Sequence, residues 1–370
     1  MHDATAEELA DWDDHVVEVP GGHVYQSRAW AACRRAAGWT PRFLVADDGA
    51  RVLALTRTWP VIGGGSAYLP RGPVPGRGEL PGGWEDLAER QVAVSDRLAA
   101  EGMDVVAADP EVPAAEPGFR ARIEAAGFRP IEEIQPSRHR MTLRLGGDAN
   151  EATVLAGIAK STRQRIRGAE RDGVTVVRHD VRVERSGPGE GFVSPAEPGA
   201  DALDRFYDLL LETGERRQFS FGPRSVFVTW WRTAHEAGHL VYLEARAGDP
   251  GGAPLAGLIL YRHGGRLSTV HSGDHAATRS EHPGALHLLR WRATQLAIRE
   301  GCSEMDLGGV DVAGARGEPR EGDPLHGLYQ HKRAFGGRWL ELTGAHERVF
   351  DARGYALGRL TGRLARLAHR

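Results

Sequence analysis

The chain has 370 residues, of which 41% are hydrophobic and 26% are charged, so it is long enough for two domains of roughly 150 residues, each with its own core. Its formal net charge of -3 excludes attraction of the whole surface to nucleic acid, so any such contact needs a local basic patch. No apolar run approaches the roughly 18 residues of a membrane span, and the acidic start from Met1 to Asp14 is unlike a signal sequence. We expect a cytoplasmic monomer without stable membrane insertion.

Helix and strand signals alternate through the first part of the chain. The expected elements are a helix over 25–38 with Ser27 as its N-cap, strands over 42–46, 51–60 and 67–74, a helix over 84–101, a strand over 104–108, a helix over 118–126 and a strand over 138–145. Such alternation is typical of a mixed α/β domain, which we assign to residues 1–147.

The second half repeats this order. The expected elements are a long helix capped by Asp148, a mobile surface insertion over 182–200, helices over 201–216 and 223–237, strands over 240–247, 255–262 and 266–271, a helix over 284–300 and a strand over 304–307. We assign residues 148–350 to a second domain like the first. A last helix over 351–370 is expected to pack back on the first domain.

Cysteine and lysine are both rare in this chain. Cys33 and Cys302 are the only cysteines, so neither a disulfide framework nor a cysteine metal site is possible, as in a reducing compartment.

Of the 47 basic residues, only Lys160 and Lys332 are lysines. An ammonium is a compact point charge, whereas guanidinium is a planar fork, so a lysine in an arginine-rich chain can mark a place where the fork does not fit. Chance survival is an equal alternative for either lysine.

A basic stripe follows Asp148. Lys160, Arg163 and Arg167 are spaced i, i+3 and i+7, so they share one face of the expected helix. Like charges at this spacing repel by roughly a few tenths of a kcal/mol per pair unless an anion such as phosphate lies against them. The stripe therefore suggests binding of a phosphate. The alternatives are a solvated face, or pairing with carboxylates of 182–200.

One short stretch matches the zinc metalloprotease signature His-Glu-x-x-His, from His235 to His239. That chemistry requires both imidazoles on one helical face. Gly238 and the strand pattern from Leu240 break the helix between them, so we expect no metal site.

The strand order also suggests an acetyl-CoA-dependent N-acetyltransferase fold. Its pyrophosphate loop, Arg/Gln-x-x-Gly-x-Gly/Ala, has one literal match, Arg144 to Ala149, which follows the last strand of the first domain rather than the strands over 255–271. Use of acyl-CoA is therefore disfavoured, although an acyl-CoA N-acyltransferase stays an alternative. No Ser/His/Asp or Cys/His set with interpretable spacing competes with these readings.

Several motifs together resemble the Fem family of aminoacyl-tRNA-dependent transferases, which build peptidoglycan cross-bridges. They are Tyr25-Gln-Ser-Arg-Ala-Trp30 with Gly38-Trp39, Pro70-Arg-Gly-Pro-Val74, Lys160-Ser-Thr-Arg-Gln-Arg-Ile-Arg167, His271-Ser-Gly273, Asp306-Leu-Gly-Gly-Val310 and Gly327-Leu-Tyr-Gln-His-Lys-Arg-Ala-Phe-Gly-Gly337. The resemblance implies a mixed α/β chain of two tandem N-acetyltransferase-like (GNAT-like) domains with a cleft between them. No segment fits the coiled-coil arm of the staphylococcal members, so the compact FemX-like form is the nearer match.

The resemblance also implies roles for single residues. Lys332 falls on the lysine that contacts the precursor's diphosphate beside the transferred acyl group, and His331 departs from the phenylalanine usual before it. Arg217, Arg35 and His271 are further candidates for the cleft. Lys160, Arg163 and Arg167 are the candidates for tRNA.

The expected activity is transfer of an amino acid from aminoacyl-tRNA, as co-substrate and without another cofactor, to an amine of a UDP-muramyl peptide or lipid-linked precursor. An ester attacked by an amine needs positioning, a stabilised oxyanion and a route for one proton, but no protein nucleophile. Transfer to a small molecule or peptide antibiotic, and a non-catalytic protein that binds anions, stay open as alternatives. The amino acid and the acceptor are not specified by the sequence.

Overall fold

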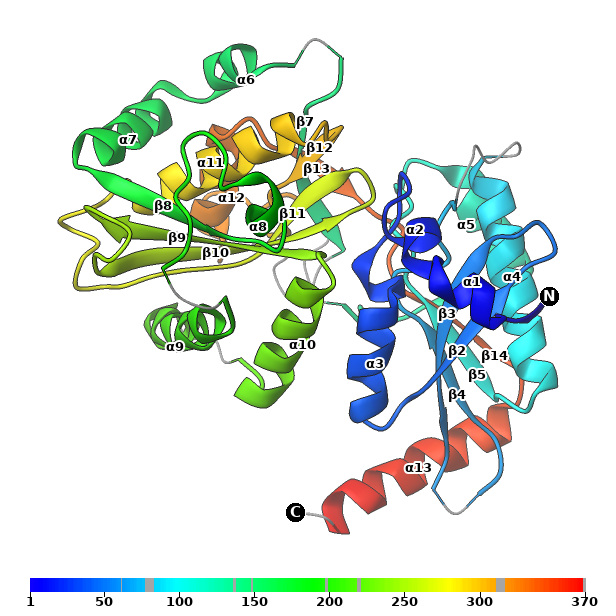
Figure 1. The fold of residues 1–370 in the computed structure, drawn as a ribbon. Helices are drawn as coiled ribbons and strands as arrows, with labels where there is room; N and C mark the ends of the chain where they lie inside the picture. Colours follow the sequence, from blue (N-terminus) through cyan, green and yellow to red (C-terminus); the bar gives the residue numbers. More distant parts are fainter. Residues whose placement is uncertain are drawn as a thin grey trace. The chain divides into compact units, whose positions relative to one another are not determined.

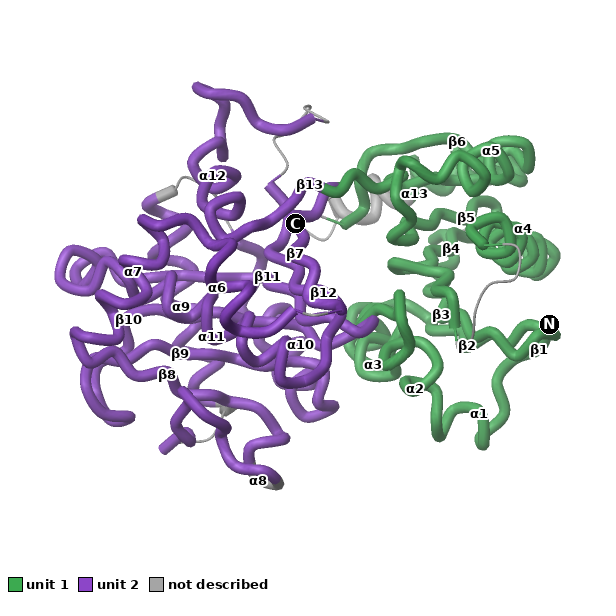
Figure 2. Tube along the Cα trace, turned by 90° about the horizontal axis from the view of Figure 1, so that it is seen from above, with its two compact units in different colours: residues 1–138, 340–370 green, residues 139–339 purple. Residues whose placement is uncertain are grey.

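The structure is a computed structural model that describes residues 1–60, 62–76, 83–135, 138–147, 149–196, 199–217, 221–310 and 317–368 (Figure 1); the side chains of 184–185, 199–200, 217 and 362–368 are not described. The chain divides into two compact units. Unit 1 comprises residues 1–138 and 340–370, and unit 2 comprises 139–339 (Figure 2).

Unit 1 is built on a sheet with the strand order β1-β2-β3-β4-β5-β14-β6. Its strands are β1 (His2–Asp3), β2 (Thr40–Val45), β3 (Arg51–Thr58), β4 (Gly65–Leu69), β5 (Val105–Ala108), β6 (Arg129–Pro130) and β14 (His346–Val349). Its helices are α1 (Ala6–Ala10), α2 (Trp12–Val16), the 3₁₀ helix η1 (Val24–Gln26), α3 (Arg28–Ala36), α4 (Trp84–Ala100), α5 (Pro117–Ala125) and α13 (Ala352–Ala368). Leu98 and Val94 of α4 pack on Leu69 and Val106 of the strands, which forms the core.

Unit 2 has a second sheet with the order β13-β7-β12-β11-β10-β9-β8. Its strands are β7 (His139–Arg144), β8 (Val174–His179), β9 (Leu240–Ala247), β10 (Pro254–His263), β11 (Arg266–Asp274), β12 (Glu304–Asp306) and β13 (Arg338–Glu341). Its helices are α6 (Glu151–Gly157), α7 (Lys160–Arg171), α8 (Val183–Ser186), α9 (Gly199–Arg217), α10 (Arg224–Glu236), α11 (Ala285–Arg299) and α12 (His326–Ala334).

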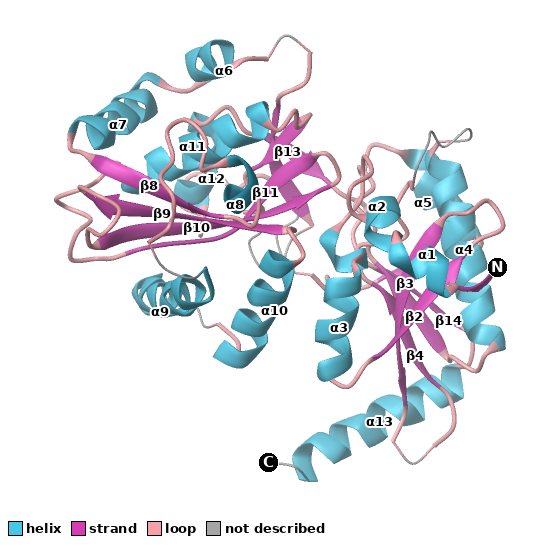
Figure 3. Cartoon of the chain, viewed as in Figure 1, coloured by secondary structure: helices cyan, strands magenta, loops and turns pink. Residues whose placement is uncertain are grey.

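Helices cover both faces of the second sheet (Figure 3). Val241 and Leu243 of β9 belong to the core cluster that includes α11. Tyr242, between them in the strand, meets the Phe206 ring of α9 at 5.0 Å between centroids. Because successive strand residues point to opposite faces, α11 and α9 lie on opposite sides of the sheet.

The prediction of one long helix after Asp148 is wrong, because the chain forms two helices, α6 and α7, in this region. Asn150 caps α6 by accepting hydrogen bonds from Ala152 N and Thr153 N, each at 3.0 Å. Ile158 then adopts an extended conformation (ψ 139°) and is buried in the core, which ends α6. Asp148 lies outside the described residues.

The segment expected as a mobile insertion over 182–200 packs against β8 in its described part. Val193 N donates to Val176 O at 2.9 Å, and Arg178 N donates to Val193 O at 3.1 Å. Phe192 is buried in the core of unit 2. Phe192 and the hydrogen bonds of Val193 therefore hold this part of the segment against the sheet, while most of its other described residues are exposed or half-buried.

The two units differ from the expected domains 1–147 and 148–350 at both boundaries. β7, expected to close the first sheet, pairs antiparallel with β12 in unit 2. β14 returns to unit 1, where it pairs antiparallel with β5, and α13 belongs to the same unit. Within the described ranges, no helix combines the length and the apolarity needed to cross a membrane.

Candidate functional site

The parallel ladder between β11 and β12 is short and ends next to a turn that contains Gly308 and Gly309. Only three residue pairs form it, and the last is Ser268 with Asp306. Gly308 follows with φ 80°, and its N–H donates to Asp306 Oδ1 at 2.7 Å. A Cβ on Gly308 would lie 2.9 Å from Thr269 O. A side chain is therefore excluded here by both the backbone angle and the neighbouring strand.

Lys332 of α12 lies at this end of the ladder. Its side chain is buried, with 5% of the residue exposed, and Nζ donates to Gly309 O at 2.8 Å. Nζ also lies 3.2 Å from the position that a Cβ on Gly308 would occupy. The tight approach to backbone gives a physical reason for the compact ammonium, because a planar guanidinium needs more room.

His331 packs beside Lys332 on the same helix. Its ring meets His287 of α11 at 4.8 Å and Phe335 at 5.2 Å between centroids. Burial, followed by the charge of Arg290, lowers the pKa of His331 to about 2. Burial, followed by the charge of Arg165, lowers the pKa of His287 to about 4. Both imidazoles are therefore neutral at physiological pH.

Three cations from three helices act on the pKa of His331, and we call Arg165, Arg290 and Lys332 the cationic cluster. Arg290 is buried and its Nη2 donates to Ser272 Oγ of β11 at 3.3 Å. All three cations lower the pKa of His331. Guanidinium and ammonium groups that act on one imidazole in this way favour a phosphate or diphosphate ligand.

Of the other cleft candidates, His271 lies in a different environment. Its ring packs against Phe227 (5.6 Å) and Trp231 (5.5 Å) of α10, and burial lowers its pKa to about 4. Arg217 ends α9, and its side chain is outside the described set. Arg35 is exposed on α3 of unit 1. Lys332 and His331 are thus the two predicted residues that the structure brings together.

The predicted tRNA stripe divides into two kinds of residue. Arg163 Nη1 donates to Ala156 O at 2.8 Å and to Ile158 O at 2.5 Å, so this guanidinium holds the C-terminal end of α6. Lys160 and Arg167 are exposed on α7. The alternative of pairing with carboxylates of 182–200 does not apply to Arg163, because its hydrogen-bond partners are backbone carbonyls.

The zinc signature is interrupted as expected. Helix α10 ends at Glu236, and Gly238 has φ 79° before β9 begins. His235 lies in the last turn of the helix, whereas buried His239 follows the break. Among the residues placed by the structure, no group of three or more His, Cys, Asp or Glu is arranged to hold a metal ion.

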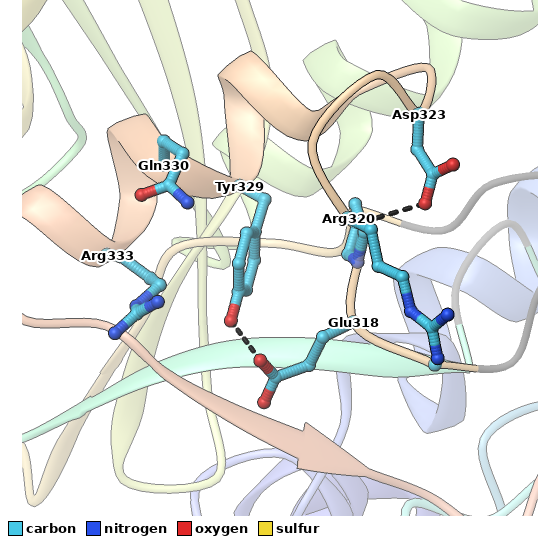
Figure 4. A pocket seen from close by; sticks show the side chains of 8 residues that line it. Glu318, Arg320, Asp323, Tyr329, Gln330 and Arg333 are labelled. Atoms are coloured by element: carbon cyan, nitrogen blue, oxygen red, sulfur yellow. Dashed lines mark hydrogen bonds between the residues drawn. The ribbon is translucent and has the colours of Figure 1, made fainter.

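The other flank of α12 borders an open pocket of about 710 Å³ (Figure 4). Tyr329 and Arg333 line it from the helix, and Glu318 and Arg320 line it from the preceding loop. The Tyr329 hydroxyl donates to the Glu318 carboxylate, and the Arg333 guanidinium lies 5.6 Å from the Tyr329 ring centroid. Burial and then the Glu318 hydrogen bond raise the pKa of Tyr329.

Sequence reasoning missed a buried polar cluster in unit 1. The Tyr68 hydroxyl donates to Asp109 Oδ1 at 2.9 Å, Arg71 N donates to the same oxygen at 2.7 Å, and Gln135 Nε2 donates to the Tyr68 hydroxyl at 3.0 Å. Burial raises the pKa of Asp109 to about 6. A carboxyl directly after the strand 105–108 was the available signal, and only the fold shows that Arg71 reaches it.

Comparison with known proteins identifies the fold. The solved structure of FemX is 18% identical to this chain, covers 96% of it and 98% of its own length, and superposes with a TM-score of 0.74. The chain has the fold of FemX. A family model described as an acetyltransferase (GNAT) domain matches residues 160–333, from the start of α7 to α12. The expected mixed α/β architecture of tandem GNAT-like domains is confirmed, and the longest helix that the structure describes, α9, has 19 residues, too few for a coiled-coil arm.

Two further structures share the Fem fold at lower similarity. They are the C-terminal domain of a putative lysylphosphatidylglycerol synthetase from Agrobacterium fabrum (14% identity, 98% of this chain and 97% of that chain, TM-score 0.52) and L-PGS from Bacillus licheniformis (12% identity, 98% of both chains, TM-score 0.50). No curated protein matches the sequence. The GNAT-domain match supports an acyltransferase-type protein as the coarse assignment.

Proposed function

We propose that this protein is an aminoacyltransferase that moves an amino acid from aminoacyl-tRNA to an amine of a peptidoglycan precursor. The observation that carries the proposal is the cationic cluster at the end of the β11–β12 ladder, in a chain with the fold of FemX. Lys332, Arg290 and Arg165 offer the charge that a diphosphate of the precursor requires.

An acyl-CoA donor fits the structure less well. In GNAT-type enzymes the helix N-terminus after the central strands receives the CoA pyrophosphate, which here would be the start of α11. A Cβ on Gly284, the N-cap of α11, would lie 2.3 Å from Arg165 O and 3.0 Å from Ala169 Cβ. Helix α7 therefore covers this N-terminus, and a pyrophosphate would have to displace it.

The reaction itself needs little covalent chemistry from the protein. The acceptor nitrogen attacks the ester carbonyl, the bond to the ribose oxygen breaks, and one proton leaves the nitrogen while the ribose oxygen gains one. Lys332 supplies positive charge for the oxyanion or for phosphate. His331 has a pKa of about 2, so it stays neutral and is too weak a base to hold the amine's proton.

The pocket on the other flank of α12 suits the nucleotide end of the donor. Its volume of about 710 Å³ lies within the range of roughly 300 to 1,000 Å³ typical of small-ligand sites. Arg320 and Arg333 provide guanidinium groups for phosphate, and Gln330 provides an amide at the rim. In this arrangement α12 separates donor nucleotide from acceptor diphosphate.

The test is transfer itself. The protein is incubated with a total charged tRNA pool and, separately, with a UDP-muramyl peptide, a lipid-linked precursor and small-molecule or peptide amines, and each acceptor is analysed by mass spectrometry. A mass increase of one amino-acid residue on a muramyl precursor supports the proposal. An increase only on small amines indicates the antibiotic-type acceptor, an increase that requires acyl-CoA contradicts the tRNA donor, and no increase on any acceptor indicates a non-catalytic protein that binds anions.

A further inference from the structure

We propose that an aromatic enclosure beside β11 receives the side chain of the transferred amino acid and admits only an uncharged one. We call it the aromatic niche, and it consists of Phe221, Phe227, Trp231 and His271. This inference rests on the proposed function, since it names the class of amino acid that the same site takes. It also assigns a role to His271, which the cationic cluster does not use.

The middle of β11 is less covered than the residues on either side of it. Residues 269–272 are half-buried, whereas Ser268 and Gly273 are buried. The register with β10 shifts at Val270, which has no partner of its own in that strand. The ladder with β12 has already ended at Ser268. This stretch is therefore the part of β11 that a ligand can reach.

Both ends of the half-buried stretch touch residues of the proposed site. Ser272 Oγ accepts a hydrogen bond from Arg290 Nη2 at 3.3 Å. Thr269 O lies 2.9 Å from the Cβ position of Gly308, and Lys332 Nζ lies 3.2 Å from that same position. With the acceptor diphosphate in the cationic cluster and the donor nucleotide on the other flank of α12, as proposed, the aminoacyl ester between them lies next to this stretch.

His271 points away from the cationic cluster, toward a group of aromatic rings. Ser272 contacts α11, and successive residues of a strand point to opposite faces, so His271 faces α10. Its ring lies 5.9 Å from Phe221, 5.6 Å from Phe227 and 5.5 Å from Trp231 between centroids. Phe221 and Phe227 are half-buried like His271, so the aromatic niche is partly open.

The niche carries no formal charge. Burial lowers the pKa of His271 to about 4, so its imidazole is neutral at physiological pH. A charged side chain would lose its hydration here without gaining a counter-charge, which is costly. Ring faces can attract an ammonium, but the cationic cluster beyond Ser272 opposes this. An uncharged side chain therefore fits the niche best.

Two polar groups of the niche are available to a ligand. Trp231 Nε1 is buried without a hydrogen-bond partner among the residues that the structure describes. The ring nitrogens of His271 make no hydrogen bond within the same ranges. Buried polar groups are normally paired, so these favour a ligand that brings a hydrogen-bonding oxygen. The side chain that we expect is thus apolar or carries a hydroxyl.

The experiment measures binding of amino-acid methyl esters, which mimic the aminoacyl ester, to the full chain by saturation-transfer NMR. The probes are the methyl esters of leucine, serine and lysine and the α-methyl ester of glutamate. The variants are Phe221→Glu, which adds a carboxylate at the open side of the niche, and His271→Leu, which removes hydrogen bonding. Val226→Glu is the matched control, because it adds the same charge at an exposed residue of α10. Thermal unfolding verifies that each variant folds.

The parent should bind the leucine and serine esters tighter than the lysine and glutamate esters by roughly tenfold or more. Phe221→Glu should bind the lysine ester at least as tightly as the leucine ester, a gain that loss of structure cannot produce. His271→Leu should weaken binding of the serine ester by about fivefold relative to the leucine ester. Val226→Glu should keep the preference of the parent.

Equal binding of charged and uncharged esters by the parent, no binding of any ester, or parental selectivity in Phe221→Glu would overturn the proposal. The niche would then be part of the core of unit 2. Transfer is read separately, as a mass increase on the acceptor. Transfer of a charged amino acid would overturn this inference alone, whereas ester selectivity without any transfer would count against the proposed function alone.

Discussion

A buried polar cluster around Asp109 in unit 1 and one around His331 in unit 2 differ in the charge that surrounds their titratable groups. In unit 1, Asp109 accepts hydrogen bonds from Tyr68 and from the Arg71 backbone, so a carboxyl is enclosed by donors of its own unit. In unit 2, burial, followed by the charge of nearby arginines, lowers the pKa of His331 and of His287, so both rings stay neutral. The first arrangement completes its own hydrogen bonding, whereas the second accumulates positive charge that an anion would neutralise. The comparison supports our proposal that the anionic ligand binds in unit 2.

The largest expected effect concerns Lys332. Replacing it with alanine should reduce transfer by about 100- to 1,000-fold, the range for loss of one group that stabilises developing charge. Lys332→Arg should also be poor, since the ammonium lies 3.2 Å from the Cβ position of Gly308. Arg338→Ala, which changes an exposed cation of β13, is the control. Turnover of Lys332→Ala at the parental rate, with an unchanged thermal unfolding curve, would remove Lys332 from the centre of the site.

The next effect concerns Asp109 and pH. Its folded pKa is about 6, above the usual 3.8, so the folded state binds the proton more tightly than the unfolded state. The stabilisation from this group is complete below pH 3.8 and is lost as pH rises to 6, by about 3 kcal/mol in the free energy of unfolding. Asp109→Asn should flatten that dependence in urea titrations from pH 4 to 7. A variant with the parental pH profile would show that the carboxyl is solvated.

His331 should give the free energy of unfolding the opposite pH dependence, with a smaller change than Asp109 gives. Its folded pKa of about 2 lies below the usual 6.5, so its contribution to stability is present above pH 6.5 and falls as the solution is acidified. Between pH 7 and pH 5 the loss should be about 1 to 2 kcal/mol, and His331→Phe should remove it. Inorganic pyrophosphate bound in the cationic cluster should raise this pKa, visible in the imidazole resonances of the parent. No change on saturation would argue against an anion site here.

The smallest effects separate two arginines of α7. Arg163→Ala should lower the free energy of unfolding by about 1 kcal/mol, because Ala156 O and Ile158 O lose their donor. Arg167→Ala should leave thermal unfolding unchanged but reduce the log–log salt slope of charged-tRNA binding by roughly 0.7 to 0.9. If instead Arg167→Ala destabilises the fold and leaves the slope intact, α7 is a structural helix only.

The sequence by itself determined most of the local structure. Ser27 caps α3 by accepting a hydrogen bond from Trp30 N at 3.0 Å, and Gly238 ends α10 with φ 79°, as their residue types predict. The strands from Leu240 to Asp274 follow their runs of apolar residues closely. Lys332 could be singled out because lysine is so rare in this chain. These features depend on neighbours in sequence, and local patterns describe such neighbours well.

Only the tertiary structure decided the rest, since it depends on residues far apart in the chain. Arg290 and His287 look like ordinary members of a buried helix, and nothing near them in sequence predicts the 4.8 Å contact between His287 and His331. β14 pairs with β5 more than 200 residues earlier, an arrangement that no local signal specifies. Arg163 was assigned to tRNA because a stripe of charges shows spacing but not partners, and its partners became visible only once α6 ended at Gly157. Local periodicity determines which residues share one face of a helix or strand, whereas tertiary packing determines what that face contacts.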